Sequence, residues 1–291
     1  MLALRRLNGH RLRLQFKDRS WHWELKEYRE SESEVHRSAD IVRMISRIKG
    51  GSALDVGARD GHFSKILAKQ FASVTALDLD QPQLDHPGIV CVSGDVTELA
   101  FPDDRFDMVV CTEVLEHIPQ HQLVDACSEL ARVSRDYLLI GVPFKQDIRV
   151  GRTTCNTCGV ANPPWGHVNA FDEQRLLSLF SQLKVEELSF VGINDASTNS
   201  LSTLLMDVAG NPYGTYDQEE PCVACGARLN KPQPRSLFQK VCTKSAFWTR
   251  WVTQALRGAR PYWMHCLFRK TGKLTVHGSA TDGRTPSIDS T

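Results

Sequence analysis

No stretch of this sequence approaches the roughly twenty consecutive apolar residues that span a lipid bilayer. Met1 to Leu4 are followed by Arg5 and Arg6 before a hydrophobic region can form, so we expect no cleavable signal peptide. These two absences favour a cytoplasmic protein. In a reducing compartment the nine cysteines are expected to be free thiols or metal ligands rather than disulfides.

Acidic residues are missing from one long part of the chain. Between Pro221 and Thr281 there is no Asp or Glu, while Lys and Arg recur and aromatic residues are interleaved with them. The whole chain has a formal net charge of only +1, so its overall charge does not require a nucleic-acid partner. The basic segment has three interpretations: a solvated face, a peripheral contact with the inner face of a membrane, or an RNA-binding surface. No RNA-binding signature supports the last, and nucleic acid is not expected.

The stretch Ala53 to Ser64 is where a candidate binding site begins. A short apolar run ending in Asp55 predicts a buried parallel strand, Gly57 and Gly61 permit a tight turn, and His62 to Phe71 has the spacing of a helix. Such a turn lets the backbone approach a ligand closely, because glycine has no Cβ. The following helix then points unpaired N–H groups toward the same place.

Further short apolar runs end in polar residues in the same way. Val74 to Asp78, Ile89 to Val92 and Phe106 to Cys111 each predict a strand, and Asp136 to Phe144 predicts another. Strands that alternate with helices form a doubly wound parallel sheet, in which ligands bind beyond the carboxyl ends of the strands. The polar residues that end these runs are therefore expected along one edge of the sheet.

Four motifs, LDVGARDGHFS, VTALDLD, GDVTELAFPDDRFDMVVCTEVLEHI and YLLIGVPF, give residues 40 to 208 a resemblance to the class I S-adenosylmethionine-dependent methyltransferases. The resemblance implies an α/β, Rossmann-like, doubly wound sheet of seven mostly parallel strands, with S-adenosyl-L-methionine as the methyl donor. It also implies that Val185 to Ile193 and Leu201 to Val208 are the final, antiparallel strands. One departure is Arg59, which stands where the family usually has a glycine.

The resemblance assigns roles to residues at the strand ends. Asp55 and Gly57 would line the methionine end of the donor, Asp78 would accept from the ribose hydroxyls, and Asp95 would meet the adenine amino group. The complete expected donor-binding set is Asp55, Gly57, Ala58, Gly61, Asp78, Leu79, Asp95, Val96 and Thr112. For Asp107, which begins a strand, we expect a structural role.

The expected catalytic residues are Glu113, His117 and His167. His117 could take a proton from a hydroxyl acceptor, because an imidazole titrates near neutral pH. Two alternatives stay open: a helical turn whose acids are favoured by the helix dipole, and a magnesium site, since Glu-x-x-Glu-His resembles the metal site of some RNA and quinone-precursor methyltransferases. His167 could be a base, a wall of the acceptor pocket, or a cap of the next helix.

Two Cys-x-x-Cys-Gly units flank the last elements of the predicted core. Two residues between thiolates let both reach one tetrahedral ion, and the glycine relieves the turn that follows. Cys155, Cys158, Cys222 and Cys225 therefore predict a structural zinc site that ties the insertion to the C-terminal segment. A redox role is the minor alternative.

These observations divide the chain into four expected parts. They are an N-terminal extension (1–34), a methyltransferase core (35–210, with an insertion at 145–170), a Cys-pair and basic aromatic segment (211–277) and a disordered tail (278–291). The predicted activity is transfer of a methyl group to oxygen of a small-molecule, glycan or lipid-linked acceptor. RNA methylation, or a catalytically silent binding or scaffold protein, remains as an alternative, and the sequence does not predict the oligomeric state.

Overall fold

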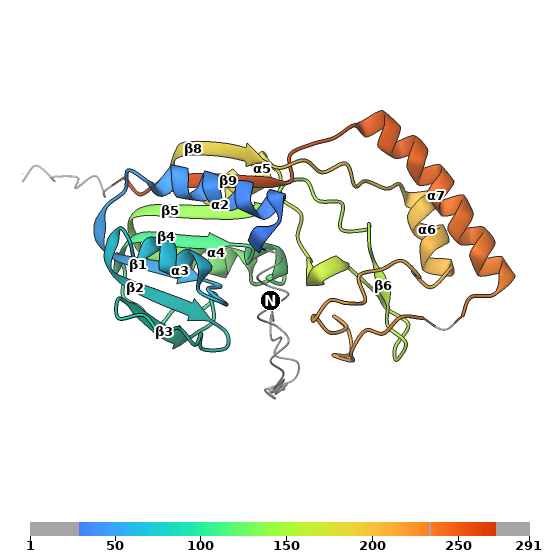
Figure 1. Cartoon of the computed structure of the whole chain (residues 1–291), viewed down its shortest axis with the longest axis horizontal. Coiled ribbons are helices and arrows are strands. Elements are labelled where there is room, and N and C mark those ends of the chain that lie inside the picture. Colours follow the sequence, from blue (N-terminus) through green and yellow to red (C-terminus); the bar gives the residue numbers. More distant parts are fainter. Residues whose placement is uncertain (1–28, 233, 272–291) are drawn as a thin grey trace, which may run out of the picture.

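The computed structural model describes residues 29–232 and 234–271, so most of the predicted N-terminal extension and the predicted tail lie outside it (Figure 1). Its main sheet has seven strands in the order β3-β2-β1-β4-β5-β9-β8. The strands are β1 (Gly50–Val56), β2 (Phe71–Asp78), β3 (Ile89–Ser93), β4 (Phe106–Thr112), β5 (Ser134–Pro143), β8 (Lys184–Val191) and β9 (Trp263–Arg269). The first five are mutually parallel, and β9 runs antiparallel to both β5 and β8. The predicted Rossmann-like α/β fold is confirmed.

Helices cover both faces of this sheet, and alternate residues of each strand divide between two cores. Leu54, Val109 and Leu138 pack with α4 (Leu123–Val133) and α5 (Glu173–Leu179), whereas Ala53 and Met108 pack with α2 (Glu32–Ile45) and α3 (His62–Leu67). Successive side chains of a strand point to opposite faces, so strands buried on both sides are apolar throughout. This explains why the runs in the sequence are continuous rather than alternating.

One predicted strand is wrong. Leu201 to Val208 lies in helix α6 (Ser200–Val208), whose N-terminus is capped by Asn199, the side chain of which accepts from Ser202 N–H at 2.8 Å. The sheet takes its seventh strand instead from β9, far beyond the predicted end of the core at residue 210. The division of the chain at that residue remains a prediction, but one central strand lies outside it.

Local interactions fix the other elements much as expected. Asp172 Oδ1 accepts from Arg175 N–H at 2.8 Å and caps α5. Asp107 has the structural role predicted for it, because its Oδ2 accepts from the N–H groups of Gly51 and Ser52 at 2.7 and 2.9 Å. Helix α3 is shorter than the predicted span, since Phe71 already begins β2.

The remaining elements lie to one side of the sheet, at the right of Figure 1. They are a small hairpin of β6 (Thr153–Thr154) and β7 (Ala161–Asn162), the short helix η2 (Pro164–Gly166), α6, and the long helix α7 (Leu237–Arg257). Within the described ranges, no helix combines the length and apolar character needed to cross a membrane.

Candidate active site and cysteine cluster

A cavity of about 410 Å³ opens where β1 and β4 end and the glycine turn begins. Seven of the residues predicted for the site line it: Asp55, Gly57, Ala58, Thr112, Glu113, His117 and His167. They come from three separate parts of the chain. The sheet edge therefore assembles the predicted donor-side and catalytic residues around one space.

The glycine turn is held by its neighbour β2. The N–H groups of Gly57 and Ala58 both donate to the carbonyl of Leu77, at 2.8 and 3.0 Å. Arg59 has φ 46, the left-handed conformation that the family's usual glycine adopts without strain. Its N–H donates to Asp78 Oδ2 at 3.0 Å, and its guanidinium reaches Glu219 at 3.5 Å. Arg59 thus links the turn to the C-terminal segment.

Asp55 is a buried carboxyl group in the cavity wall. Burial raises its pKa to about 6, against the opposing effect of Ser64, whose hydroxyl donates to Asp55 Oδ2 at 2.6 Å. A carboxyl with this pKa changes charge just below neutral pH. The charge on this wall of the cavity is therefore sensitive to mild acid.

Glu113 follows β4 in a strained conformation, with φ 58. Its carboxylate lies 3.9 Å from Arg37, a buried residue of α2 that also pairs with Glu34 at 2.6 Å. Burial raises the pKa of Glu113, and Arg37 opposes that shift. This contact connects the Glu113 to His117 stretch to α2.

His117 and His167 lie edge to face, with ring centroids 4.6 Å apart. Burial lowers the pKa of His117 well below its usual range, and His167 lowers it further. Burial also lowers the pKa of His167 to about 4, while His167 Nδ1 lies 2.6 Å from Gln146 Oε1. Both imidazoles are therefore neutral at pH 7, and His117 Nδ1 has no hydrogen-bond partner within residues 29–232 and 234–271.

Asn169 holds these two histidines together, a role that the sequence did not indicate. Its buried side-chain amide donates to the carbonyls of Leu115 and Ile118 at 3.0 and 2.6 Å, on either side of His117. The N–H groups of Val168 and Asn169 also donate to the carbonyl of Glu116. These bonds fasten the segment after His167 onto the short helix η1 (Leu115–His117).

Glu116 joins the two histidines in a buried cluster whose ligand atoms all lie within 4.8 Å of one another. Burial raises the pKa of Glu116 well above its usual range, and Glu113 adds to that effect. Glu113 itself is not part of the cluster, so the three residues of the magnesium hypothesis do not converge. One carboxylate with two imidazoles also differs from the oxygen-rich ligand set that Mg²⁺ prefers.

The other predicted donor-binding residues do not line the cavity: Gly61, Asp78, Leu79, Asp95 and Val96. A Cβ on Gly61 would meet Leu84 at 2.3 Å, and its φ is +72, so packing and the turn require glycine there. Asp95 is exposed and accepts from Thr97 N–H and Oγ1–H at 2.9 and 2.7 Å. Their roles toward a donor remain predictions.

Several residues of the cavity wall were not predicted from the sequence: Arg29, Arg37, Phe63, Trp165, Glu220, Tyr262 and Trp263. Tyr262 and Trp263 reach the cavity because β9 pairs beside β5, with Trp263 opposite Pro143. The apolar run from Trp263 to Phe268 was the one available signal, since it predicts a buried strand in an otherwise basic segment.

The four cysteines form a second centre, and the two Cys-x-x-Cys-Gly units fold alike. In each unit the glycine N–H donates to the carbonyl of the first cysteine at 2.9 Å, for Gly159 to Cys155 and for Gly226 to Cys222. Both glycines are left-handed, with φ 74 and 72. The repeated turn presents both sulfurs of a pair on one side.

The two pairs face each other. Cys155 Sγ lies 3.7 Å from Cys225 Sγ, and Cys158 Sγ lies 3.5 Å from Cys222 Sγ. A tetrahedral zinc with Zn–S bonds of about 2.3 Å places its sulfurs about 3.8 Å apart. The spacing of the thiols therefore fits one such ion. A hydrogen bond beside the cluster also joins the insertion to the second Cys-x-x-Cys-Gly unit, since Asn162 Oδ1 accepts from Val223 N–H at 2.8 Å.

The methyltransferase domain family matches residues 54–137, from the last residues of β1 to the first residues of β5. This segment contains the glycine turn and the Glu113 to His117 stretch, so the chain is similar to methyltransferase domains over this part of the Rossmann-like sheet. The match stops before the cysteine pairs, α6 and α7.

Similar curated proteins carry methyltransferase names. A ubiquinone biosynthesis O-methyltransferase of Coxiella burnetii is 33% identical over 95 residues, which are 29% of this chain and 41% of that protein. A probable S-adenosylmethionine-dependent methyltransferase of Mycolicibacterium smegmatis is 29% identical over 118 residues, 38% of this chain and 46% of its own length. The chain thus spans less than half the length of these relatives.

Among solved structures, a putative methyltransferase from Bacillus halodurans has a TM-score of 0.49 and 18% identity, covering 81% of this chain and 100% of its own. The N-methyltransferase NodS from Bradyrhizobium japonicum, in complex with S-adenosyl-L-homocysteine, has a TM-score of 0.43 and 20% identity, covering 60% of this chain and 86% of its own.

Proposed function

We propose that this chain is an S-adenosylmethionine-dependent methyltransferase that methylates oxygen of a small-molecule, glycan or lipid-linked acceptor. The observation that carries the proposal is the single cavity lined by the glycine turn, Asp55, Glu113 and the two neutral histidines. Its volume of about 410 Å³ lies in the range of small-molecule sites. The methyltransferase domain over residues 54–137 and the named O-methyltransferase among the relatives support the donor and the acceptor atom.

The donor, when bound, supplies an electrophilic methyl group on sulfur. Gly57 and Asp55 would hold its methionine end, and the walls from Trp165 and Trp263 would exclude water from the reacting atoms. His117 would accept the proton of the acceptor hydroxyl as the new C–O bond forms and the C–S bond breaks. A neutral imidazole is the state that can take this proton. His167 and Asn169 would keep His117 in place.

Asp78→Asn is expected to weaken binding of S-adenosyl-L-homocysteine by roughly tenfold or more, because a charged acceptor for the ribose hydroxyls is lost. The amide keeps an oxygen for Arg59 N–H, so the turn is preserved. Calorimetric titration measures the affinity. Asp80→Asn, an exposed carboxylate two residues along, is the matched control and should bind as the wild type does. Equal affinity in all three proteins would remove Asp78 from the donor site.

Binding of the same ligand is expected to weaken in mild acid. Asp55, with its pKa raised to about 6, is ionised above that pH and can pair with the donor's ammonium group; below it the carboxyl becomes neutral. Below pH 6 the affinity should therefore decrease with falling pH, by about tenfold for each pH unit at the limit. Ser64→Ala removes a hydrogen bond to the ionised form and should move the midpoint to higher pH. An affinity that is constant from pH 7 to 5 would contradict this role.

We also propose that Cys155, Cys158, Cys222 and Cys225 hold a structural zinc ion. Four thiolate ligands leave no open position for a substrate, so the ion would serve the fold rather than the reaction. The nearby contacts favour this role, because Trp165 N–H donates to Gln218 Oε1 at 2.8 Å and Glu220 lines the cavity. Zinc would thereby stabilise one wall of the acceptor side.

A further inference from the structure

Helices α6 and α7 form a hairpin-like pair that lies side by side, apart from the main sheet (Figure 1). They pack through small and polar groups. Ser202 Oγ donates to the carbonyl of Ala246 at 2.9 Å, and Asn199 Nδ2 donates to Thr253 Oγ1 at 2.7 Å. The buried side chains of α7 are those of Cys242, Thr243 and Ala246. The inner surface of the pair is therefore not the apolar stripe usual for a surface helix.

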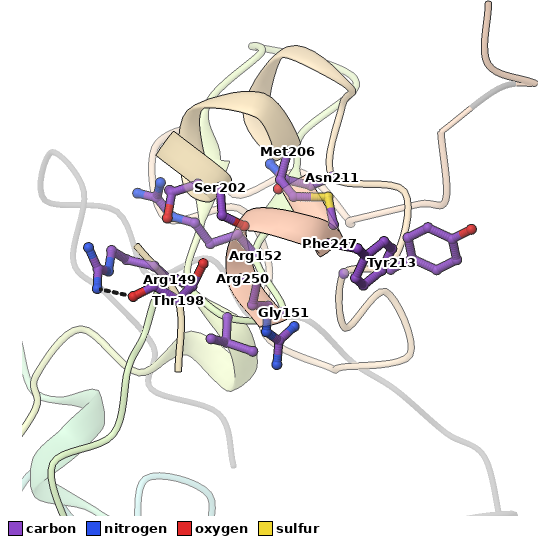
Figure 2. A pocket seen from close by; sticks show the side chains of 13 residues that line it. Arg149, Gly151, Arg152, Thr198, Ser202, Met206, Asn211, Tyr213, Phe247 and Arg250 are labelled. Carbon is purple, nitrogen blue, oxygen red and sulfur yellow. Dashed lines mark hydrogen bonds between the residues drawn. The ribbon is translucent and has the colours of Figure 1, made fainter. Parts of the chain in front are cut away.

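The polar character of the inner side is visible in a small cavity of about 50 Å³ between the pair and the rest of the chain (Figure 2). Arg149 Nη2 donates to the carbonyl of Thr198 at 3.1 Å, and Arg250 Nε donates to the carbonyl of Ser197 at 3.1 Å. Arg152 pairs with Asp207 of α6 at 3.1 Å. Charged groups thus fasten the pair to the protein from within.

The apolar side chains of α7 point to solvent instead. Leu237, Val241, Trp248 and Trp251 are 81%, 63%, 71% and 67% exposed. With 3.6 residues per turn, these four positions fall on one face of the helix. On α6, Leu201, Leu204 and Val208 share a face and are exposed as well. In both helices the apolar face is exposed and the polar face packs on the protein, the reverse of an ordinary amphipathic helix. These apolar faces are therefore suited to a partner surface.

The charged side chains of α7 are all of one sign. The helix contains no Asp or Glu, and the exposed Lys240 and Lys244 lie at the edge of the apolar face and within it, respectively. Two copies of this face would bring like charges together, which disfavours self-association. A lipid surface with anionic headgroups is complementary, because Lys and Arg are attracted to it and Trp is favoured at the interface.

We infer that the α6–α7 pair docks on an anionic lipid surface, with α7 lying in the plane of the headgroups. Leu237, Val241, Trp248 and Trp251 enter the apolar boundary, while Lys240 and Lys244 contact the headgroups. The charged inner side keeps its bonds to the protein. This inference does not depend on the methyl transfer proposed above.

Flotation of the full chain with vesicles tests it. We expect binding to phosphatidylcholine vesicles that contain phosphatidylglycerol, weaker binding to phosphatidylcholine alone, and a loss of roughly tenfold or more in Trp248→Gln/Trp251→Gln. Val90→Gln/Val124→Gln removes two exposed apolar residues of the sheet domain, 57% and 62% exposed, and should bind as the wild type does. Lys240→Gln/Lys244→Gln removes both charges and should weaken the binding to anionic vesicles more than the binding to phosphatidylcholine alone.

All substituted positions in α7 are exposed, so the variants should keep the melting temperature and the affinity for S-adenosyl-L-homocysteine. Failure of the wild type to bind anionic vesicles, or equal binding by the tryptophan variant, overturns the proposal. The proposal would also be overturned if the wild type were a dimer in solution and the tryptophan variant a monomer, since a second copy would then occupy the face. Capture by an acidic protein without vesicle binding would have the same consequence.

Discussion

His117→Gln is expected to lower kcat for methyl transfer to a hydroxyl acceptor about 100-fold or more. The glutamine amide fills similar space but cannot take up a proton. In the wild type, burial and His167 hold the pKa of His117 well below its usual range, so the imidazole is neutral and available as a base at pH 7. Transfer from labelled S-adenosyl-L-methionine to an acceptor found in a panel of phenols, catechols and sugars measures the rate.

The affinity for S-adenosyl-L-homocysteine separates loss of a base from loss of the site. It should change less than about twofold in the variant, because His117 is placed on the acceptor side. His121→Gln is the matched control, an exposed histidine four residues along. A variant that methylates as fast as the wild type would show that proton transfer to His117 is not part of the reaction.

Cys155→Ser/Cys222→Ser is expected to reduce bound zinc from about one ion per chain to almost none and to lower the melting temperature by roughly 10 °C. Each substitution removes one thiolate from a different pair, so no remaining set of four sulfurs can surround the ion. The free energy of metal binding is part of the folding free energy, which makes the loss large. Metal analysis and thermal unfolding of the same samples provide both readouts.

Cys91→Ser is a suitable control, because this half-buried cysteine lies on β3, away from the cluster. It should retain the metal and the wild-type melting temperature. Wild-type protein that purifies folded and without zinc, and takes up none when zinc is added, would exclude the structural site. A variant that keeps its zinc would instead show that the ion lies elsewhere.

The sequence predicted those parts of the fold that local pattern determines. The runs ending at Asp55, Asp78 and Thr112 became β1, β2 and β4, because strands buried on both faces need continuous apolar residues. The site at their carboxyl ends followed from the topology alone. The Cys-x-x-Cys-Gly units were equally local, since their spacing sets the turn geometry.

One failure overlooked a local signal, and the others concern contacts between residues far apart in the chain. Leu201 to Val208 was assigned to a strand from the resemblance, although leucines at 201, 204 and 205 have helical spacing and Asn199 is a good cap. The contact of Arg37 with Glu113, and the bonds of Asn169 around His117, join residues more than fifty positions apart. Nothing in the local pattern of either residue indicates its distant partner. His265 is similar: it is tolerated at a buried position of β9 because Asp40 of α2 lies 2.6 Å from its Nδ1.

The position of β9 between β5 and β8 sets the order in which the sheet can form. Among the strands that the structure describes, β8 pairs with β9 alone, and β9 is made some seventy residues later. During synthesis, β8 and the outer edge of β5 therefore stay unpaired while the cysteine units, α6 and α7 emerge. The pairing of β9 with β5 and β8 joins residues far apart in sequence, so it has a correspondingly large loop-closure entropy cost. A cysteine cluster that gathers the intervening chain early would shorten that loop before the last strand arrives.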